Sequence, residues 1–403
     1  IQAASLHHAL AGKDIIAQAR TGSGKTAAFS LPLLCRLNPR DFGAQALVLC
    51  PTRELATQVA TEIRRLARYQ ANIKVLTLCG GQAIGPQIGS LEHGGHIIVG
   101  TPGRIKDHLR KQTLDLSRVK TLVLDEADRM LDMGFAQDIS DIIDTTPASR
   151  QTLLFSATYP SDIQSMSSRF QTDAERIEVD AGQGSQQIEQ HFYICQAAGK
   201  RAALLQIIAH HQPEQAVVFC NTREVVRDVT RTLRDAHDSA TALHGDLEQR
   251  ERDQVLVQFK QGSLRLLVAT DVAARGLDID DLPAVINYDL PRDTEQYVHR
   301  IGRTGRAGKS GVALSLFTEK ERHRLDALAS YQSREIDFEA VERLGPAHAS
   351  LPAPAFVTIA IAGGRKNKVR PGDILGALTR EGGIEGRAVG KIDVLDHSAY
   401  VAI

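Results

Sequence analysis

The 403-residue chain carries 48 Lys and Arg against 48 Asp and Glu, so its formal net charge is zero. With 42% hydrophobic and 24% charged residues, the composition is ordinary for a globular protein, and the length predicts two or three domains. Because the net charge is zero, the composition as a whole does not indicate a polyanionic partner. A surface that binds a polyanion would have to be local. No apolar run approaches the roughly 18 residues of a membrane span, and no signal peptide is recognisable.

Five cysteines are spread over positions 35, 50, 79, 195 and 220. None forms a C-x-x-C pair, which argues against a zinc site or a redox motif. Because most lie in or after apolar runs, we predict small buried side chains in a reducing cytoplasm. The chain starts with Ile-Gln and stops within a strand-like run, so we expect it to be a fragment of something longer.

In the first half of the chain, short β-rich runs alternate with helical stretches. Expected strands are 14–17, 46–49, 75–78, 97–99, 121–124 and 152–155, with a helix such as 54–69 between two of them. Continuous apolar strands separated by helices predict a parallel sheet that is covered on both faces.

The same rhythm starts again in the second half, with expected strands at 216–220, 240–243, 264–269, 284–287 and 311–316. The predicted fold is therefore α/β, with two parallel sheets in tandem. A Gly- and Gln-rich stretch, DAGQGSQQ, is typical of a linker. We expect domains at 1–180 and 188–344, joined by a linker at 181–187.

A third unit follows a Pro- and Ala-rich second linker at 345–355. Residues 356–403 predict a strand at 356–361, a basic turn, a helix at 371–379 and strands at 389–394 and 399–403. This pattern is typical of the front part of a small α+β module whose end is missing.

The stretch ARTGSGKT follows the first expected strand and precedes a helix-compatible run at 27–34. It fits the P-loop template G-x-x-x-x-G-K-[ST], except that Ala19 replaces the first Gly, which still permits the turn. Backbone N–H groups at a helix N-terminus would surround phosphates. Lys25 would lie on the β/γ-phosphates and the Thr26 hydroxyl would bind Mg²⁺. The expected ATP contacts are Ala19, Arg20, Thr21, Gly22, Ser23, Gly24, Lys25 and Thr26.

A second signal is TLVLDEAD at 121–128, where an apolar strand ends in carboxylates about 100 residues after the P-loop. Asp125 would hold Mg²⁺ through water, and Glu126 would orient or deprotonate the attacking water. Three carboxylates can also form a solvated helix start. The P-loop upstream favours the catalytic interpretation.

The chain resembles the DEAD-box RNA helicases. The resemblance rests on DEAD at 125–128 together with seven further strings in family order: PTREL at 51–55, GG at 80–81, TPGR at 101–104, SAT at 156–158, VVFCNT at 217–222, ATDVAARGLDI at 269–279 and HRIGRTGRAG at 299–308. It covers nearly all of residues 1–330. The resemblance implies two RecA-like lobes that bind ATP and RNA between them.

The resemblance also implies further roles around ATP. Gln2 matches a glutamine that reads adenine, since a carboxamide can pair with both a donor and an acceptor. Asp278 matches a ribose contact. Arg303 and Arg306 match arginine fingers, which would neutralise charge that develops on the γ-phosphate.

Other matched residues would couple hydrolysis to strand opening. They are Asp128 in the DEAD string, Ser156 and Thr158 in SAT, and His299, which would meet the DEAD string. The two hydroxyls of SAT could also simply cap the next helix.

The resemblance implies RNA contacts through backbone amides, hydroxyls and arginines, which bind phosphate and sugar rather than base edges. The motor is therefore expected to be indifferent to sequence and to unwind RNA locally. In the first lobe the matched residues are Pro51, Thr52, Arg53, Gly81, Thr101, Gly103 and Arg104. In the second lobe they are Thr222, Arg223, Gly245 and Thr270.

Near the C-terminus, GGRKNKVRPGDILGAL and GRAVGKIDVLDHSAYVAI resemble the RNA-binding domain of a ribosomal-RNA-specific bacterial branch of this family, a diverged RRM. The resemblance implies a hairpin of large-subunit ribosomal RNA as partner, within pre-ribosomal particles. Only Tyr400 is in place for base stacking on the sheet. Recognition is therefore expected through Arg365, Lys366, Lys368 and Arg370, with Lys391 as a further candidate.

Together these features predict a cytoplasmic, monomeric ATP-dependent RNA helicase that uses ATP and Mg²⁺. Three alternatives stay open: a general helicase acting on messenger RNA or in RNA decay, an ATP-gated RNA clamp without turnover, and a DNA helicase of the same superfamily.

Overall fold

The computed structural model describes residues 1–19, 23–159, 161–178, 188–236, 239–274, 279, 281–305, 310–345 and 353–403. The predictions for Arg20, Thr21, Gly22, Asp278 and Arg306, for the linker 181–187 and for most of the linker 345–355 lie outside these ranges. The chain divides into two compact units. None of the helices in the described ranges is long and apolar enough to cross a membrane.

The first unit contains a parallel seven-stranded sheet in the order β3-β4-β2-β5-β6-β1-β7. Its strands are β1 (Ile15–Gln18), β2 (Ala46–Leu49), β3 (Val75–Leu78), β4 (Ile97–Gly100), β5 (Thr121–Asp125), β6 (Gln151–Ser156) and β7 (Glu175–Glu178). Its helices are α1 (Gln2–Leu10), α2 (Lys25–Cys35), α3 (Arg53–Ala67), α4 (Gly85–Glu92), α5 (Pro102–Arg110), α6 (Ala127–Asp132), α7 (Ala136–Ile143) and α8 (Ser161–Phe170).

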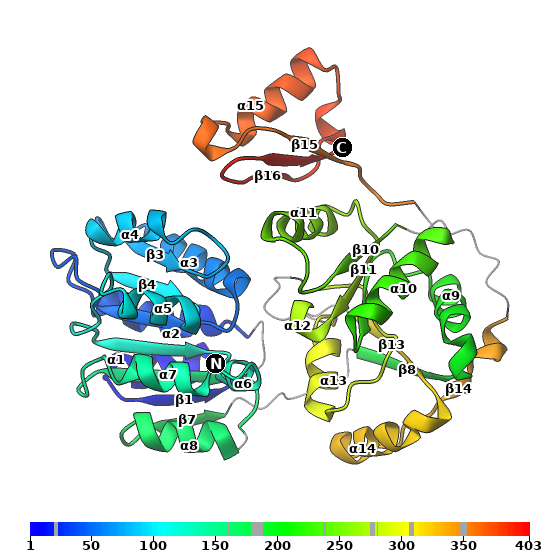
Figure 1. The fold of residues 1–403 in the computed structure, drawn as a ribbon, viewed down its shortest axis with the longest axis horizontal. Coiled ribbons are helices and arrows are strands. Elements are labelled where there is room, and N and C mark those ends of the chain that lie inside the picture. Colours follow the sequence, from blue (N-terminus) through cyan, green and yellow to red (C-terminus); the bar gives the residue numbers. More distant parts are fainter. Residues whose placement is uncertain are drawn as a thin grey trace. The chain divides into compact units, whose positions relative to one another are not determined.

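Helices cover both faces of this sheet (Figure 1). In β2, Val48 packs into one core while Leu47 and Leu49 pack into the other, because successive side chains of a strand point to opposite faces. The prediction of a parallel sheet buried on both sides is confirmed. The edge strand β7 was not predicted, because Glu175–Glu178 contains only one apolar residue.

The second unit contains a parallel sheet in the order β10-β11-β9-β12-β13-β8-β14, which repeats the order of the first sheet with seven added to each label. The strands are β8 (Ile188–Ile194), β9 (Ala216–Cys220), β10 (Ala240–Leu243), β11 (Leu266–Thr270), β12 (Ala284–Asn287), β13 (Gly311–Phe317) and β14 (Glu339–Ala340). The helices are α9 (Lys200–His211), α10 (Arg223–Asp235), α11 (Gln249–Lys260), α12 (Asp271–Ala274), α13 (Thr294–Ile301) and α14 (Arg322–Gln332), with 3₁₀ turns η2 (Ala197–Gly199), η3 (Glu319–Glu321) and η4 (Val341–Leu344). We call this part the second lobe.

The second unit also includes the C-terminal module, residues 356–403, with an antiparallel sheet in the order β15-β17-β16. Its elements are β15 (Thr358–Ile361), η5 (Arg365–Asn367), α15 (Pro371–Gly376), η7 (Gly386–Ala388), β16 (Ile392–Val394) and β17 (Ala399–Ala402). The predicted helix 371–379 changes after Gly376 into a π-helical turn, Ala377–Glu381. The predicted strand 389–394 begins only at Ile392, after the η7 turn.

The cysteine prediction needs one correction. Cys50, Cys79, Cys195 and Cys220 are buried, as expected, but Cys35 is exposed at the last position of α2. No pair of cysteines in the described residues forms a disulfide, since all five thiols are free.

Candidate nucleotide and RNA sites

The motifs of the first unit follow strands of a parallel sheet, so they meet at one edge. The P-loop follows β1, DEAD closes β5 and SAT closes β6, and these three strands are adjacent in the order β5-β6-β1. GG, TPGR and PTREL follow β3, β4 and β2, which are adjacent in the other half of the sheet. The residues predicted to bind the nucleotide therefore lie along one half of this sheet edge, which we call the nucleotide half. Those predicted to bind RNA lie along the other half, the RNA half.

The P-loop leads directly into helix α2, with Gly24 as the N-cap residue. Gly24 precedes α2 with φ 85° and ψ 24°, a left-handed conformation that favours glycine. The Gln2 amide donates to the Gly24 carbonyl at 3.3 Å, and a Cβ on Gly24 would lie 2.4 Å from Gln2 Nε2. The structure thus brings the predicted adenine-reading glutamine against the phosphate loop.

The Lys25 ammonium is directed into the same loop. Its Nζ donates to the Ala19 carbonyl at 3.1 Å, and the side chain is buried. Thr26 follows it in the first turn of α2, while Ser23 precedes Gly24. A buried ammonium at a helix N-terminus provides the positive charge that a polyphosphate requires.

Asp125 ends β5 and is almost fully buried, at 3% exposure. Its Oδ1 is buried without a hydrogen-bond partner among the described residues. Burial is the main cause that raises the pKa of Asp125 to about 6; the nearby Lys25 charge opposes this shift, and Glu126 adds to it. A buried carboxylate oxygen without a partner, near the Lys25 charge, suits the hard oxygen ligands that Mg²⁺ requires when it is bound together with phosphates.

Glu126 has an unusual backbone, with φ 53° and ψ 52°, directly before α6. For a non-glycine residue this left-handed conformation is strained and often marks a functional site. Its carboxylate accepts from Arg129 Nη1 at 2.9 Å, and both side chains are only 6% exposed. Sequence reasoning missed Arg129, although an arginine three residues after Glu126 on a helix was a usable signal.

Asp128 connects the DEAD and SAT strings. Its Oδ2 accepts from the backbone N–H of Ala157 at 3.1 Å and of Thr158 at 3.0 Å, and from Thr158 Oγ1 at 3.1 Å. Ser156 lies nearby as the last residue of β6, with its hydroxyl oxygen buried and without a partner among the described residues. The structure therefore brings these predicted coupling residues together, and the Thr158 hydroxyl bonds to Asp128.

In the RNA half of this edge, arginines hold the loops in place. Arg53 Nη1 donates to the Gly80 carbonyl at 2.8 Å, and Arg104 Nη2 donates to the Gln82 carbonyl at 2.8 Å. Gly81 has φ 72°, and a Cβ there would collide with the Arg53 guanidinium. Two helices begin at this place, α3 after Thr52 and α5 after Thr101. Their first turns offer backbone donors to phosphate. Pro51 directly precedes Thr52, and Gly103 is the second residue of α5.

The second lobe repeats this arrangement at the ends of β9, β10 and β11. Thr222 follows β9 and caps α10 through its hydroxyl, Gly245 follows β10, and Thr270 is the last residue of β11. Arg223 forms an ion pair with Asp246, which also pairs with Arg227 at 3.0 Å. The predicted RNA residues of the second lobe therefore share one half of its sheet edge.

Arg300, which lies in the HRIGRTGRAG string, was not singled out from the sequence but is central in the second lobe. Its guanidinium donates twice to Asp271, to the Asn221 side chain at 3.0 Å and to the Asp289 carbonyl at 2.6 Å. His299 precedes it on α13, and Arg303 follows one turn later and is 6% exposed. The network fixes the segment that carries these two predicted residues.

The basic turn of the C-terminal module packs against the loop between β16 and β17. Arg365 Nε donates to the Val394 carbonyl at 2.9 Å, and Lys366 Nζ lies 4.0 Å from Asp396 and 3.3 Å from His397. Lys368 and Arg370 are exposed. Asp396 thus lies close to a basic turn whose own sequence contains no acidic residue.

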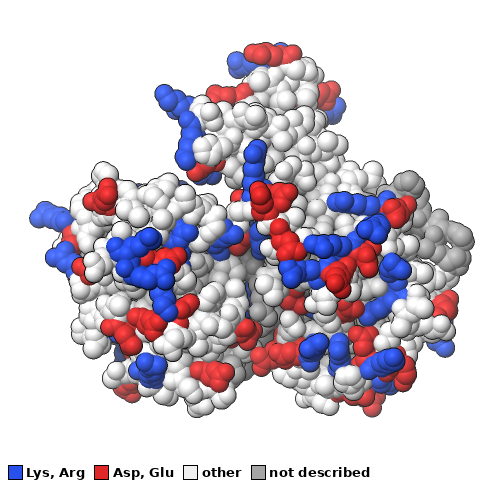
Figure 2. All heavy atoms as spheres, in the orientation of Figure 1, with Lys and Arg blue, Asp and Glu red and all other residues white. Residues whose placement is uncertain are grey.

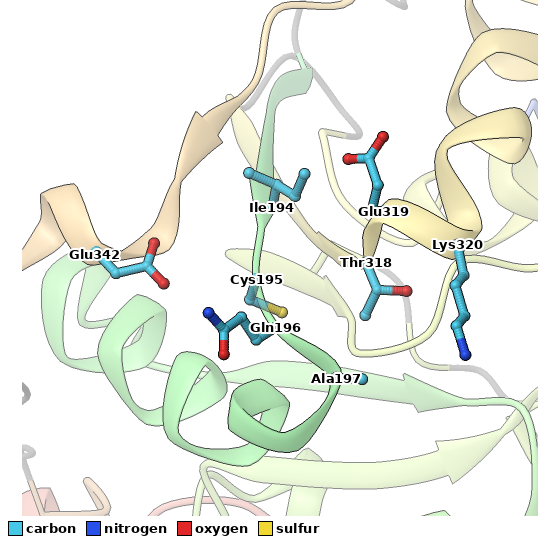
Figure 3. A pocket seen from close by; sticks show the side chains of 8 residues that line it. All are labelled: Ile194, Cys195, Gln196, Ala197, Thr318, Glu319, Lys320 and Glu342. Atoms are coloured by element: carbon cyan, nitrogen blue, oxygen red, sulfur yellow. The ribbon is translucent and has the colours of Figure 1, made fainter.

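Figure 2 shows basic and acidic side chains interspersed on the visible surface, in keeping with the zero net charge. A pocket of about 450 Å³ in the second lobe contains none of the predicted site residues. As Figure 3 shows, it lies where β8 and β13 end; its lining is Ile194, Cys195, Gln196, Ala197, Thr318, Glu319, Lys320 and Glu342. We assign it no part in the nucleotide or RNA sites.

Comparison with known families agrees with this geometry. Residues 1–166 match the family DEAD/DEAH box helicase, and residues 199–308 match the helicase conserved C-terminal domain. The chain is 52% identical over 405 residues to the ATP-dependent RNA helicase DbpA of Escherichia coli, covering all of this chain and 88% of that protein. The chain belongs to the DEAD-box ATP-dependent RNA helicases.

Residues 358–403 of this helicase match the DbpA RNA binding domain. A DEAD-box helicase CshA of Bacillus licheniformis is 46% identical over 338 residues, covering 84% of this chain and 69% of that protein. Among solved structures, Saccharomyces cerevisiae Dbp5 bound to RNA and ADP BeF₃ is 31% identical with a TM-score of 0.73, covering 82% of this chain and 89% of that one. The predicted fold of two RecA-like domains followed by an RNA-binding module is confirmed.

Proposed function

We propose that this helicase uses Mg²⁺ and ATP to open hairpins of large-subunit ribosomal RNA during ribosome assembly. Membership of an ATP-dependent RNA helicase family supports the motor activity. The single observation that supports ribosomal RNA as the target is the match of residues 358–403 to the DbpA RNA binding domain.

In the first lobe, Lys25 would neutralise the β/γ-phosphates, since its ammonium is buried beside the phosphate loop. Asp125 and Thr26 would hold the metal, which supplies charge neutralisation when bound. Glu126 would orient the attacking water, and Gln2 would read adenine from its position against Gly24. The contacts expected from Arg20, Thr21 and Gly22 stay part of this proposal.

From the second lobe, Arg303 and Arg306 would stabilise the charge that develops on the γ-phosphate, and Asp278 would contact the ribose. His299, Asp128, Ser156 and Thr158 would make turnover depend on bound RNA. The three hydrogen bonds from SAT to Asp128 support this coupling, because moving one string must disturb the other.

RNA would lie along the motif loops described above, held through phosphate and ribose rather than base edges. The two predicted sets, at the ends of β3-β4-β2 and of β10-β11-β9, are each contiguous along a sheet edge. The C-terminal module would add the selectivity, with Arg365, Lys366, Lys368 and Arg370 contacting the hairpin. We further propose that the protein works as a monomer in the cytoplasm; its free, mostly buried thiols suit a reducing compartment.

The targeting is tested by measuring RNA-stimulated phosphate release with a panel of RNAs, with and without ribosomal hairpins. Lys366→Gln with Lys368→Gln should weaken the hairpin response and lower the salt slope of binding by about one per lysine. Arg380→Gln with Arg387→Gln, exposed positions in the same module, is the charge-matched control. Equal stimulation by all RNAs would instead favour a general helicase, and RNA binding without turnover would favour a clamp.

A further inference from the structure

The two faces of the module's sheet have different surroundings. In the central strand β17, Ala399 and Val401 pack into a core with Ile374 of α15. Figure 1 shows α15 lying along one side of this sheet. Tyr400 and Ala402 point to the opposite face, because successive strand residues alternate.

This opposite face would be open to solvent in a sheet with a helix on only one side. Nevertheless, Tyr400 is 4% exposed and Ala402 is 1% exposed. Neither residue belongs to the apolar core with α15. Another segment of the second unit must therefore lie against this face.

That segment is the turn 261–263, which follows α11 of the second lobe. Gln261 Nε2 donates to Asp393 Oδ2 at 3.1 Å and to the Tyr400 carbonyl at 3.3 Å. Its Oε1 accepts from Thr358 Oγ1 at 2.9 Å. One glutamine thus contacts all three strands of the sheet, and at 4% exposure it is buried, although it directly follows a helix on the lobe's surface.

The backbone of the turn explains why this side chain can reach the module. Gly262 has φ 73°, and the N–H groups of Gly262 and Ser263 donate to the carbonyls of Phe259 and Gln258 in the last turn of α11. Ser263 then shares a hydrogen bond with Thr358. Phe356 packs over Gly262, since a Cβ there would lie 3.4 Å from its ring.

We infer that the sheet face carrying Thr358, Asp393 and Tyr400 is a docking surface for the second lobe, and that it is not a platform for stacked bases. Base stacking needs an exposed aromatic face, and the Tyr400 side chain is buried. The RNA is then bound by the rest of the module, including the exposed basic turn at 365–370. Docking fixes how that turn is presented relative to the second lobe.

Disulfide trapping in the full chain tests the docking surface. Ser263→Cys with Thr358→Cys, in a Cys35→Ser background, places two thiols where two hydroxyls share a hydrogen bond. The matched control is Ser263→Cys with Leu375→Cys, because Leu375 is exposed on α15 at the other face of the sheet. With a mild oxidant we expect the first pair to cross-link at least about tenfold faster. Equal rates for the two pairs would overturn the inference.

A charge swap tests the role of Gln261 with the same readout. Gln261→Glu places a carboxylate against Asp393 and should slow trapping of the 263–358 pair several-fold. Adding Asp393→Asn restores an amide–carboxylate pair with reversed polarity and should recover most of the rate. An unchanged rate in the single variant, or no recovery in the double variant, would contradict the docking role.

The trapped protein also distinguishes docking from base stacking. Hairpin RNA should bind the cross-linked and the reduced protein equally well, because the trapped face is already covered. A large loss of RNA binding on cross-linking would show that this face binds RNA. None of these tests depends on ribosomal RNA being the natural target.

Discussion

Arg300 donates two hydrogen bonds to Asp271, from Nε to Oδ1 and from Nη2 to Oδ2, each at 2.6 Å. The Arg300 side chain is 1% exposed, and the same guanidinium also bonds to Asn221 and to the Asp289 carbonyl. One arginine thereby joins the ends of β9, β11 and β12, around which the second lobe arranges its motifs.

Replacing this arginine should destabilise the second lobe strongly. Arg300→Met leaves the Asp271 carboxylate without its charged partner, which for a buried pair costs about 3–5 kcal/mol. Chemical denaturation monitored by circular dichroism measures the change. Arg231→Met, at an exposed position of α10, is the control and should stay within about 0.5 kcal/mol of wild type. Equal stability of the two variants would contradict the structural role of Arg300.

Arg129→Met should reduce turnover while leaving ATP affinity nearly unchanged. The variant removes the 2.9 Å partner that orients the Glu126 carboxylate, whereas the phosphate loop stays intact. A loss of about 10- to 100-fold in kcat is expected for a displaced catalytic group. Steady-state phosphate release at saturating RNA measures kcat and KM separately. A rise in KM with unchanged kcat would show that Arg129 acts on binding instead.

His211 should make the second lobe less stable in mild acid. Burial, with His191 and His210 nearby, lowers the pKa of His211 to about 4, despite the opposing charge of Glu189. Below pH 6.5 the unfolded state binds a proton that the folded state does not bind until about pH 4, so stability falls as the pH falls through this window.

The corresponding variant is His211→Gln, which cannot titrate. Between pH 7 and pH 5 the wild type should lose about 1–2 kcal/mol more than the variant, after allowance for the partial exposure of the ring. Urea denaturation at the two pH values gives this difference. Identical losses would mean that His211 is not held neutral by the fold.

The native protein should have one rapidly reacting thiol. Cys35 is exposed, whereas the other four cysteines are buried, and burial raises the pKa of Cys79 to about 12. Ellman's reagent should therefore label one thiol in buffer and five in denaturant. Cys35→Ser should remove the rapid phase completely, and a second rapid thiol in that variant would contradict the burial of the others.

The sequence was sufficient for the family, for two parallel sheets and for most strands, because buried parallel strands are continuous apolar runs. The strand order was not predicted from the sequence, since it depends on packing between distant segments. That order places PTREL beside TPGR, and SAT beside the P-loop. Motif order along the chain therefore indicated which residues matter, but not the division of the edge into two halves.

Which buried polar groups bond to each other could not be predicted from the sequence either. Arg300 is an ordinary charged residue in a helical stretch, and only the fold shows that it meets Asp271. Gln261 bonds to Tyr400, 139 residues later in the chain. Short strands such as Glu175–Glu178 were missed because their pattern is mostly polar.

We propose that hydrolysis requires a carboxylate from the first unit, Glu126, and a guanidinium from the second, Arg303. It is tested most directly by RNA-stimulated phosphate release from wild type, Glu126→Gln and Arg303→Lys, with each variant first confirmed to be folded by its melting curve. The account predicts that RNA stimulates the wild type and that both variants lose at least about 100-fold in kcat. Wild-type turnover in the Arg303→Lys variant, or turnover that RNA does not stimulate, would contradict it.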